Sequence, residues 1–339
     1  MSGEMSGALA QNADPAGGEA IRADAQARDK ASGDKASGAA GSRRGHDADR
    51  HHRAALDRGD ADARLVIDSG LGWGGRLRLA LQDIAETWRL RRLVWTLAFL
   101  DIKLRYRGSV LGPFWLTIST GVMIGALGFV YSKLFHTDLK TYLPFLSLSL
   151  VIWNNFISAL VNDSCVAYTT ADATIRGMRM PLSLHAARVV VRNLLILAHS
   201  VVVIVIVFGL MDTWPGGVAA MALPGLALWL VDGFAVGLLF GGFCARFRDV
   251  PPIIQSVMQI VFFVSPIIWS PSILAHRGIG VILLNANPFY DILEIVRAPL
   301  LNHMPGLETW LAALGYSAAL LVLTALFFIR ARGRIAYWV

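Results

Sequence analysis

The chain has 339 residues, of which 55% are hydrophobic and only 16% are charged. Soluble domains carry about 25% charged residues, so the composition excludes an ordinary soluble protein and favours one embedded in a bilayer. Residues 1–65 hold 10 Lys/Arg against 11 Asp/Glu, whereas residues 66–339 hold 21 against 13. The excess of basic residues therefore lies in the apolar part of the chain. It offers no soluble basic face that could bind nucleic acid.

Residues 1–65 consist largely of Ala, Gly, Asp, Arg and Ser, and the pentapeptide DKASG occurs twice in tandem, at 29–33 and 34–38. Such a segment cannot bury enough apolar surface to offset its chain entropy, so we expect a disordered cytoplasmic extension. It lacks the apolar stretch that marks a secretory signal. Three histidines in it allow either a metal site or a solvated tail, and we expect the tail and no metal site: His46, His51 and His52.

Residues 66–107 are expected to form a linker and an amphipathic helix. Leucine and valine recur at a spacing of three or four over 76–107, and the charged residues fall largely off that stripe. The uninterrupted apolar core, 93–100, is far shorter than the roughly 20 residues that span a bilayer. The pattern favours a helix that lies in the headgroup region, with Trp88 and Trp95 at the boundary. A soluble amphipathic helix packed on a partner is the alternative.

Six later segments are long and apolar enough to cross a membrane, so the sequence predicts an all-α integral membrane domain over 108–339. The segments are 109–134, 142–166, 186–210, 217–244, 252–270 and 310–329. The connections on one side carry 13 Lys/Arg and those on the other side carry 4. This bias predicts that both termini are cytoplasmic.

The connection at 271–309 is not a simple loop, because prolines interrupt it and 279–284 and 289–301 are apolar runs. Long connections without secondary structure are rare in compact domains. Two interpretations stay open: short helices that dip back into the membrane, or a plain external cap.

Four charged residues fall within the predicted spans: Asp163, Arg188, Arg192 and Asp232. A charge in a bilayer is costly unless it is paired or hydrated, so each of them marks a candidate site. Either these side chains line a hydrated path for an anionic substrate, or Asp163 pairs with Arg188 or Arg192 between helices. For Asp232 we expect an interior-facing position or one at a subunit interface.

Most of the tryptophans, Trp153 and Trp229 among them, are interpreted as belt residues at span ends rather than as platforms for sugars. No enzyme constellation stands out, and the sequence contains no Gly-Lys dipeptide, so it has no Walker A phosphate loop. If transport uses ATP, another chain must hydrolyse it. Cys165 and Cys244 lie in apolar runs and are expected to be inert.

A basic collar of Lys103, Arg105 and Arg107 precedes the first span, which begins with RYRGSVLGPFW at 105–115. This stretch and four others resemble the permeases of type-2 ABC exporters for polysaccharides and polyol phosphates, with those for O-antigen closest. The others are ARFRDVPPIIQ at 245–255, FFVSPIIW at 262–269, NPFYDILEIVRAPL at 287–300 and RGRIAYWV at 332–339. The likeness covers about residues 80–339.

The resemblance implies a homodimer of six-span subunits, each engaging a separate ABC ATPase subunit that binds ATP and Mg²⁺. The chain itself would then be no enzyme and would hold no cofactor. An interface helix would occupy 88–106, and re-entrant helices at about 278–302 would form an external gate with Pro288, Phe289, Tyr290 and Arg297. A coupling helix within 167–180 would contact the ATPase through Thr174, Ile175, Arg176, Met178 and Arg179.

The sequence therefore predicts an inner-membrane permease subunit that exports a lipid-linked polysaccharide such as O-antigen. Its collar would bind the pyrophosphate of the lipid carrier, since guanidinium forks suit phosphate oxygens. The alternatives are a type-2 ABC permease for capsule, teichoic acid or a small lipid or drug, and a polytopic glycosyl- or acyltransferase.

Overall fold

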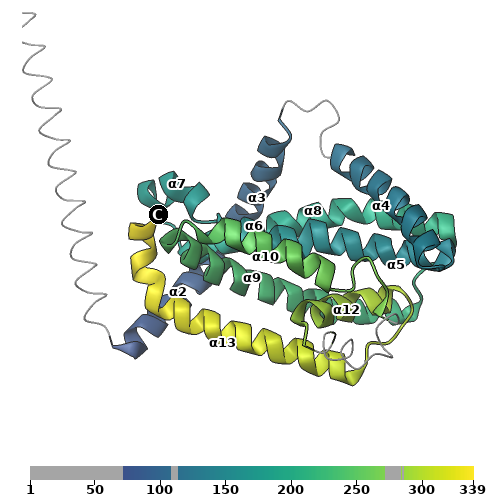
Figure 1. Ribbon diagram of the computed structural model, residues 1–339. Helices are drawn as coiled ribbons and strands as arrows, with labels where there is room; N and C mark the ends of the chain where they lie inside the picture. The colour runs from purple at the N-terminus through teal and green to yellow at the C-terminus, as the bar shows by residue number, and fades with distance from the viewer. Residues whose placement is uncertain (1–71, 108–113, 272–283, 285) are drawn as a thin grey trace, which may run out of the picture. The chain divides into compact units, whose positions relative to one another are not determined.

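The computed structural model describes residues 72–107, 114–271, 284 and 286–339, and the regular structure of these residues is helical (Figure 1). The extension predicted at 1–65 lies outside the described residues. So do 108–113, at the start of the first predicted span, and 272–283, in the external connection.

Five described segments are long and apolar enough to cross a membrane, as expected of an integral membrane protein. They correspond to the first, second, third, fourth and sixth predicted spans. They are α4 (Phe114–Leu134), α5 (Leu139–Ile152) continued by η1 (Trp153–Ile157) and α6 (Ser158–Cys165), α8 (Leu182–Met211), η3 (Gly217–Met221) with α9 (Ala222–Arg246), and α13 (Leu307–Trp338).

The segment predicted as the fifth span contains a shorter helix, α10 (Val250–Val264). Its 15 residues reach only about 22 Å, against a hydrocarbon core of about 30 Å. The helix ends where Ser265 adopts an extended backbone conformation. Pro266 explains this end, because a residue before proline is disfavoured in the helical region. The helix is therefore shorter than the apolar run that predicted it.

The helix predicted over 76–107 is in fact two helices, α2 (Trp73–Arg89) and α3 (Arg91–Arg105), separated by Leu90. Each has its own polar anchor on α8: Asp83 of α2 accepts from the backbone of Ser183, and Asp101 of α3 pairs with Arg188. Tertiary contacts such as these override a continuous helical pattern. Nothing in the repeat of leucines indicates where the break falls.

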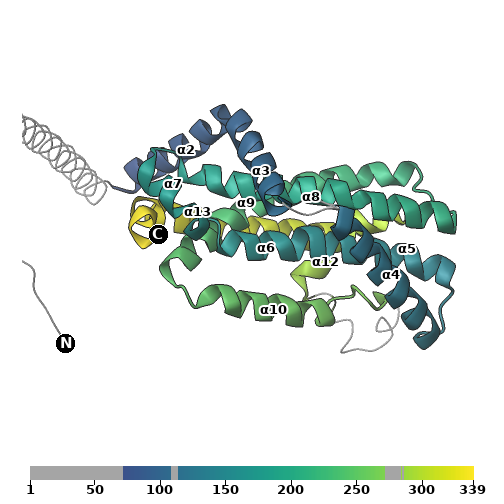
Figure 2. The ribbon, with the colours of Figure 1, turned by 90° about the horizontal axis from the view of Figure 1, so that it is seen from above.

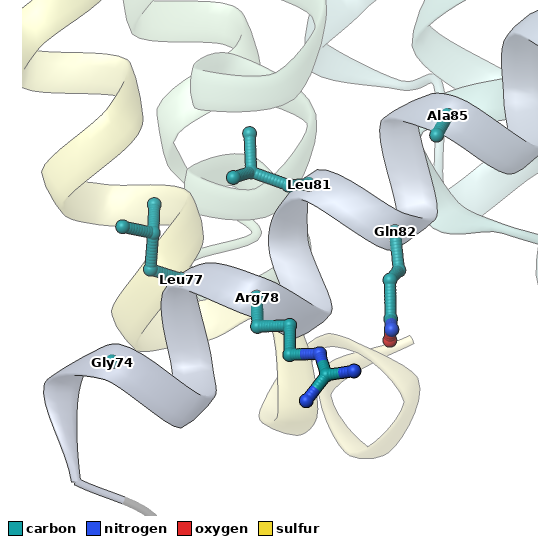
Figure 3. Close-up of a pocket in the computed structure, with 6 residues that line it drawn as sticks. All are labelled: Gly74, Leu77, Arg78, Leu81, Gln82 and Ala85. Atoms are coloured by element: carbon teal, nitrogen blue, oxygen red, sulfur yellow. The ribbon is translucent and has the colours of Figure 1, made fainter.

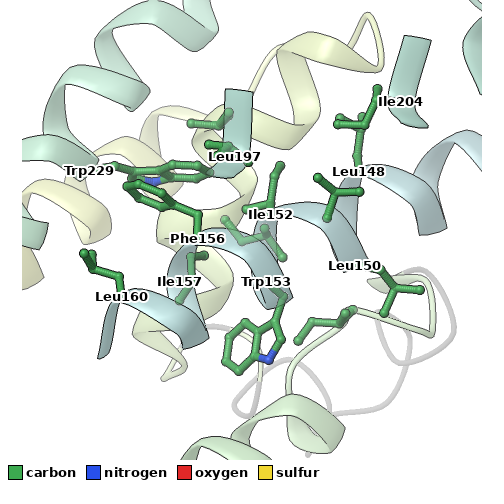
Figure 4. Packing of buried hydrophobic residues seen from close by; sticks show 14 of the residues in the cluster. Leu148, Leu150, Ile152, Trp153, Phe156, Ile157, Leu160, Leu197, Ile204 and Trp229 are labelled. Atoms are coloured by element: carbon green, nitrogen blue, oxygen red, sulfur yellow. The ribbon is translucent and has the colours of Figure 1, made fainter. Parts of the chain in front are cut away.

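The main apolar core surrounds the α5–η1–α6 segment (Figure 4). Trp153 and Trp229 lie inside it, each 2% exposed, so the interpretation as belt residues is wrong for these two. Phe156 stacks on Trp229 with ring centroids 5.4 Å apart, and Trp153 meets Phe289 edge-on at 5.7 Å. Phe289 belongs to α12 (Pro288–Leu300), so this aromatic packing ties α12 to the second predicted span.

Glycines allow α9 to approach its neighbours closely. Gly233, Gly237 and Gly241 recur every four residues, a spacing that brings membrane helices into close contact. A Cβ atom on Gly237 would lie 2.9 Å from the Cβ of Ala186 on α8, and one on Gly233 would lie 2.7 Å from a methyl of Leu160 on α6. The stripe therefore sets the distances of α9 from α8 and α6.

A second apolar cluster joins α2, α8, α9 and α13 at the end of the bundle that carries η2 (Thr169–Ala171) and α7 (Asp172–Gly177) (Figures 1 and 2). Its buried members are Ala80, Tyr168, Ala186, Leu238, Ala245, Phe328, Ala331, Ile335 and Val339. Burial raises the pKa of the Tyr168 phenol above its ordinary value. The last turns of α13 are thus packed against the predicted coupling segment.

Candidate functional site

A network of ion pairs forms around Asp101 where α3, α6 and α8 come together. It includes three of the charged residues that were predicted within spans: Arg188, Arg192 and Asp163. The Nε of Arg188 donates to Asp101 at 2.7 Å. Arg192 bridges two carboxylates, with Nη1 at 3.3 Å from Asp101 and Nη2 at 2.8 Å from Asp163. The sequence left open whether Asp163 pairs with Arg188 or with Arg192. In the structure Asp163 pairs with Arg192, whereas Arg188 pairs with Asp101.

Arg105 lies at the edge of these ion pairs. Its Nη2 is 3.8 Å from Asp163 and its side chain is 47% exposed, while Arg192 already satisfies Asp163 at the shorter distance. Lys103 and Arg107 are exposed on the same stretch of chain. The last turn of α3 and Arg107 just after it therefore carry three exposed cations, of a chemistry that suits phosphate oxygens.

The predicted coupling residues lie on and just after α7. Ile175 packs against the second apolar cluster, and Arg176 pairs with Asp172 and donates to the carbonyl oxygen of Val339 at 2.5 Å. Met178 is 57% exposed. Thr174 is half-buried, and Arg179 is exposed. One side of this short segment is therefore held by α13, and the other is accessible to a partner.

Asp83 is a buried site residue that the sequence reasoning missed. Its carboxylate accepts the backbone N–H groups of Leu182 at 3.2 Å and Ser183 at 2.9 Å, as well as the Ser183 hydroxyl. It thereby caps the N-terminus of α8, where the residue at the N-cap position, Pro181, has no side-chain acceptor. The Nε of Arg332 on α13 donates to the same carboxylate at 2.9 Å. Asp83 therefore joins α2, α8 and α13 beside the predicted coupling segment.

A weak sequence signal for Asp83 existed. It shares one face of α2 with Ala80 and Thr87, and all three are buried. A carboxylate on a face that otherwise carries small residues is a candidate for burial with a partner. That partner, Arg332, lies 249 residues further along the chain, and no local sequence pattern identifies it.

The described part of the predicted external gate contains one helix, α12, which is anchored at its start. The side chain of Asn287 accepts from the backbone of Phe289 at 3.0 Å and Tyr290 at 3.3 Å, and its amide donates to Ser265 at 2.8 Å. Pro288 follows in the first helical turn, where a missing N–H does no harm. The indole of Trp229 on α9 donates to the Ile292 carbonyl at 2.7 Å, so α12 is hydrogen-bonded to the bundle as well as packed on it.

Arg297 on α12 is fully buried. Its Nη1 donates to Ser149 at 2.9 Å and to the Pro266 carbonyl at 2.6 Å, and its Nε donates to Glu294 at 2.9 Å. The guanidinium also lies 4.5 Å from the centre of the Phe145 ring. This one side chain therefore holds together α12, α5 and the segment that follows α10.

We expect Arg297→Lys to lower the unfolding free energy by about 2–3 kcal/mol, because an ammonium group cannot reach all three oxygen partners from one position. The measurement is the midpoint of thermal unfolding of the purified protein in detergent. Arg330→Lys, at an exposed position on α13, is the control and should leave the midpoint unchanged. Equal midpoints for the two variants would contradict the anchoring role of Arg297.

Asp232 lies between α9 and α13 of the same chain. It is 7% exposed and accepts a hydrogen bond of 2.7 Å from the hydroxyl of Ser317. In the structure of the single chain, Asp232 therefore faces the interior of the bundle, which is one of the two positions expected from the sequence.

Several apolar helices of spanning length, joined by polar contacts between helices, define a multi-pass membrane protein. Residues 92–301 match the family model of the ABC-2 type transporter, and the chain belongs to this family. Membership makes it a transport subunit rather than an enzyme and implies an ABC ATPase as its partner.

Relatives of the chain carry a more specific name. The O-antigen export system permease protein RfbA of Myxococcus xanthus is 21% identical over 239 residues, which cover 70% of this chain and 92% of that protein. A protein of the same name from Klebsiella pneumoniae is 23% identical over 190 residues, covering 55% of this chain and 71% of its own length. The chain is thus a type-2 ABC permease similar to O-antigen export permeases.

Proposed function

We propose that the chain is the membrane subunit of an ATP-driven exporter that moves a lipid-linked polysaccharide, such as O-antigen, across the inner membrane. The names of the relatives support this substrate class. The observation that carries it is the exposed trio of Lys103, Arg105 and Arg107 at the end of α3. Lys103 and Arg107 are exposed and Arg105 is held only by a 3.8 Å contact with Asp163, so the trio can bind the pyrophosphate of a lipid carrier, whereas Arg188 and Arg192 are held in closer ion pairs.

The surface of α2 supports a position at the membrane boundary. Figure 3 shows Leu77 and Leu81 projecting from one side of this helix and Arg78 and Gln82 from the other, around a shallow hollow. Exposed large apolar side chains continue this stripe along the helix: Trp73, Ile84 and Trp88. An apolar stripe beside a polar face suits the headgroup region, so α2 and α3 together would form the interface element of the inner leaflet.

In this arrangement both termini would be cytoplasmic, and α10 with 265–270 would complete a sixth crossing. The helix α12 would be re-entrant and would gate the external side with Pro288, Phe289, Tyr290 and Arg297. Two copies of the chain would enclose the path, with 1–65 as a cytoplasmic extension and 66–107 leading into the transport domain at 108–339. The α7 segment would dock on the ATPase, which would hold ATP and Mg²⁺.

The double substitution Arg105→Gln with Arg107→Gln tests the role of the collar. We expect the amount of polysaccharide that reaches the cell surface to fall at least about tenfold, because charge-assisted hydrogen bonds to phosphate are lost at two positions. The matched control is Arg91→Gln with Arg92→Gln, two exposed arginines at the other end of α3. Normal export by the Arg105/Arg107 variant at normal protein levels would refute headgroup binding there.

A further inference from the structure

A row of uncharged polar side chains runs along one face of the second predicted span. Asn154 is exposed, and Ser158 and Asn162 are half-buried, although all three lie within the segment Leu139–Cys165. The amide of Asn162 donates to the carbonyl oxygen of Ser158 at 2.8 Å and is 3.3 Å from its hydroxyl. Ser158 and Asn162 therefore share one helix face, and Asn154 lies one turn further along it.

The π-helical turn η1 places Asn154 on this face. A π turn accommodates an additional residue, and such turns are frequent at functional sites. Within it, Trp153, Phe156 and Ile157 are buried in the core, while Asn154 alone of the five residues is exposed. The wide turn thus keeps the aromatic side chains packed and leaves one amide on the surface at mid-depth of the span.

Polar side chains of α10 border the same face. Trp153 and Phe262 are in ring contact at 6.2 Å, and Met258 is buried, so these residues mark the side of α10 that meets the second span. Helical geometry places Gln255 and Gln259 together on one flank of that contact. The second span and α10 run in opposite directions, and both helices wind right-handed. We therefore expect Gln255 and Gln259 to lie on the same side of the Trp153–Phe262 contact as Asn154, which follows Trp153 in the chain.

The opposite flank of α10 differs in chemistry. Its exposed side chains are Ile253, Val257 and Ile260, which are suited to lipid or to another apolar surface. Amide groups are costly to expose to hydrocarbon, so polar side chains at this depth face water, protein or a polar ligand. Gln255 and Gln259 are both exposed in the single chain. One flank of α10 thus carries two amides, Gln255 and Gln259, with the exposed Phe263 one turn beyond Gln259, and the other flank carries exposed aliphatic side chains.

We propose that Asn154, Ser158, Asn162, Gln255 and Gln259 form a polar track that binds the hydroxyl groups of the glycan as it crosses the membrane. The inference rests on the proposed function and adds the path and the substrate chemistry. None of the five side chains is charged, and amides and hydroxyls both donate to and accept from sugar hydroxyls. The inner end of the track, at Asn162, adjoins Asp163 and hence the cations of α3. A carrier phosphate bound at Arg105 would therefore leave its glycan at the start of the track.

The test uses the native host and its own surface polysaccharide, labelled by a pulse of radioactive sugar. Asn154→Leu with Gln259→Leu should slow the appearance of label at the surface about tenfold or more, since two hydrogen-bonding groups are lost. Asn154→Gln, which keeps the amide, should export nearly as wild type does. Val257→Leu with Ile260→Leu, on the apolar flank of α10, is the matched control and should leave the rate unchanged.

Three results would overturn the proposal. Normal export by the Asn154/Gln259 variant shows that the glycan does not use these amides. Slow export accompanied by dissociation of the purified complex shows that a second copy of the chain, not a glycan, covers this face. The third is unchanged surface polysaccharide after deletion of the whole gene, which refutes the proposed function and the track together. Loss of polysaccharide on deletion with normal export by the variant refutes the track alone.

Discussion

Asp83→Ala should lower the unfolding free energy by about 3–5 kcal/mol, the largest effect expected for a single substitution in this chain. The side chain of Asp83 is 1% exposed, and its loss leaves two backbone N–H groups at the start of α8 without their acceptor. It also leaves the guanidinium of Arg332 without its carboxylate. The measurement is the midpoint of thermal unfolding of the detergent-purified protein, together with the yield of folded protein in the membrane.

Two matched variants separate the capping role of Asp83 from its ion pair. Arg332→Gln removes the charge partner but leaves the cap of α8, so we expect a smaller loss of about 1.5–3 kcal/mol. Glu86→Ala removes an exposed carboxylate from the same helix and should change stability by less than about 0.5 kcal/mol. If Asp83→Ala were no more harmful than Arg332→Gln, the capping of α8 by Asp83 would contribute nothing.

Gly237→Val should destabilise the bundle by about 1–3 kcal/mol or more, because its side chain would occupy space that Ala186 already fills. Even a Cβ at this position would lie 3.2 Å from the Cα of Ala186, and a backbone atom cannot move aside as a flexible side chain can. The expected result is a lower midpoint of thermal unfolding and less folded protein. Combining Gly237→Ala with Ala186→Gly should recover most of the stability lost by Gly237→Ala alone, since it removes the nearest atom.

Gly315 on α13 provides the control for helix propensity. A Cβ atom there would meet nothing within 4 Å, so Gly315→Ala should leave stability unchanged or raise it by up to about 1 kcal/mol. If Gly237→Val and Gly315→Ala had the same midpoint, the close approach of α8 and α9 would not limit the size of residue 237.

Hydropathy and charge predicted the parts of the fold that depend on the bilayer as a solvent. Five of the predicted spans correspond to helices of spanning length because each depends on a local count of apolar residues. The end of α10 at Ser265 was not predicted, although Pro266 supplied a local signal that the apolar run concealed. Trp153 and Trp229 were misplaced because an indole suits either a membrane boundary or a packed core, and only the packing decides.

The candidate site was likewise predicted where it depends on local sequence, and not where it depends on contacts between distant helices. The exposed cations at the end of α3 were predicted, because a basic collar beside an apolar run is a feature of local sequence. The partners of Arg188, Arg192 and Asp83 were not fixed, because their pairing depends on which helix faces come together. The sequence shows that a charge in a span needs a partner, but the contact between distant helices selects which one.

The most direct measurement is ATP-dependent transport by the permease–ATPase complex in inverted membrane vesicles of the host. Lipid-linked polysaccharide from the host is added outside, where the cytoplasmic face of the complex lies, and the polymer inside the vesicles is measured after external glycan is digested. The proposed function predicts that polymer accumulates inside only with hydrolysable ATP, and that the Arg105→Gln with Arg107→Gln variant fails to accumulate it. Accumulation of a small lipid or drug, with none of the polymer, would contradict it.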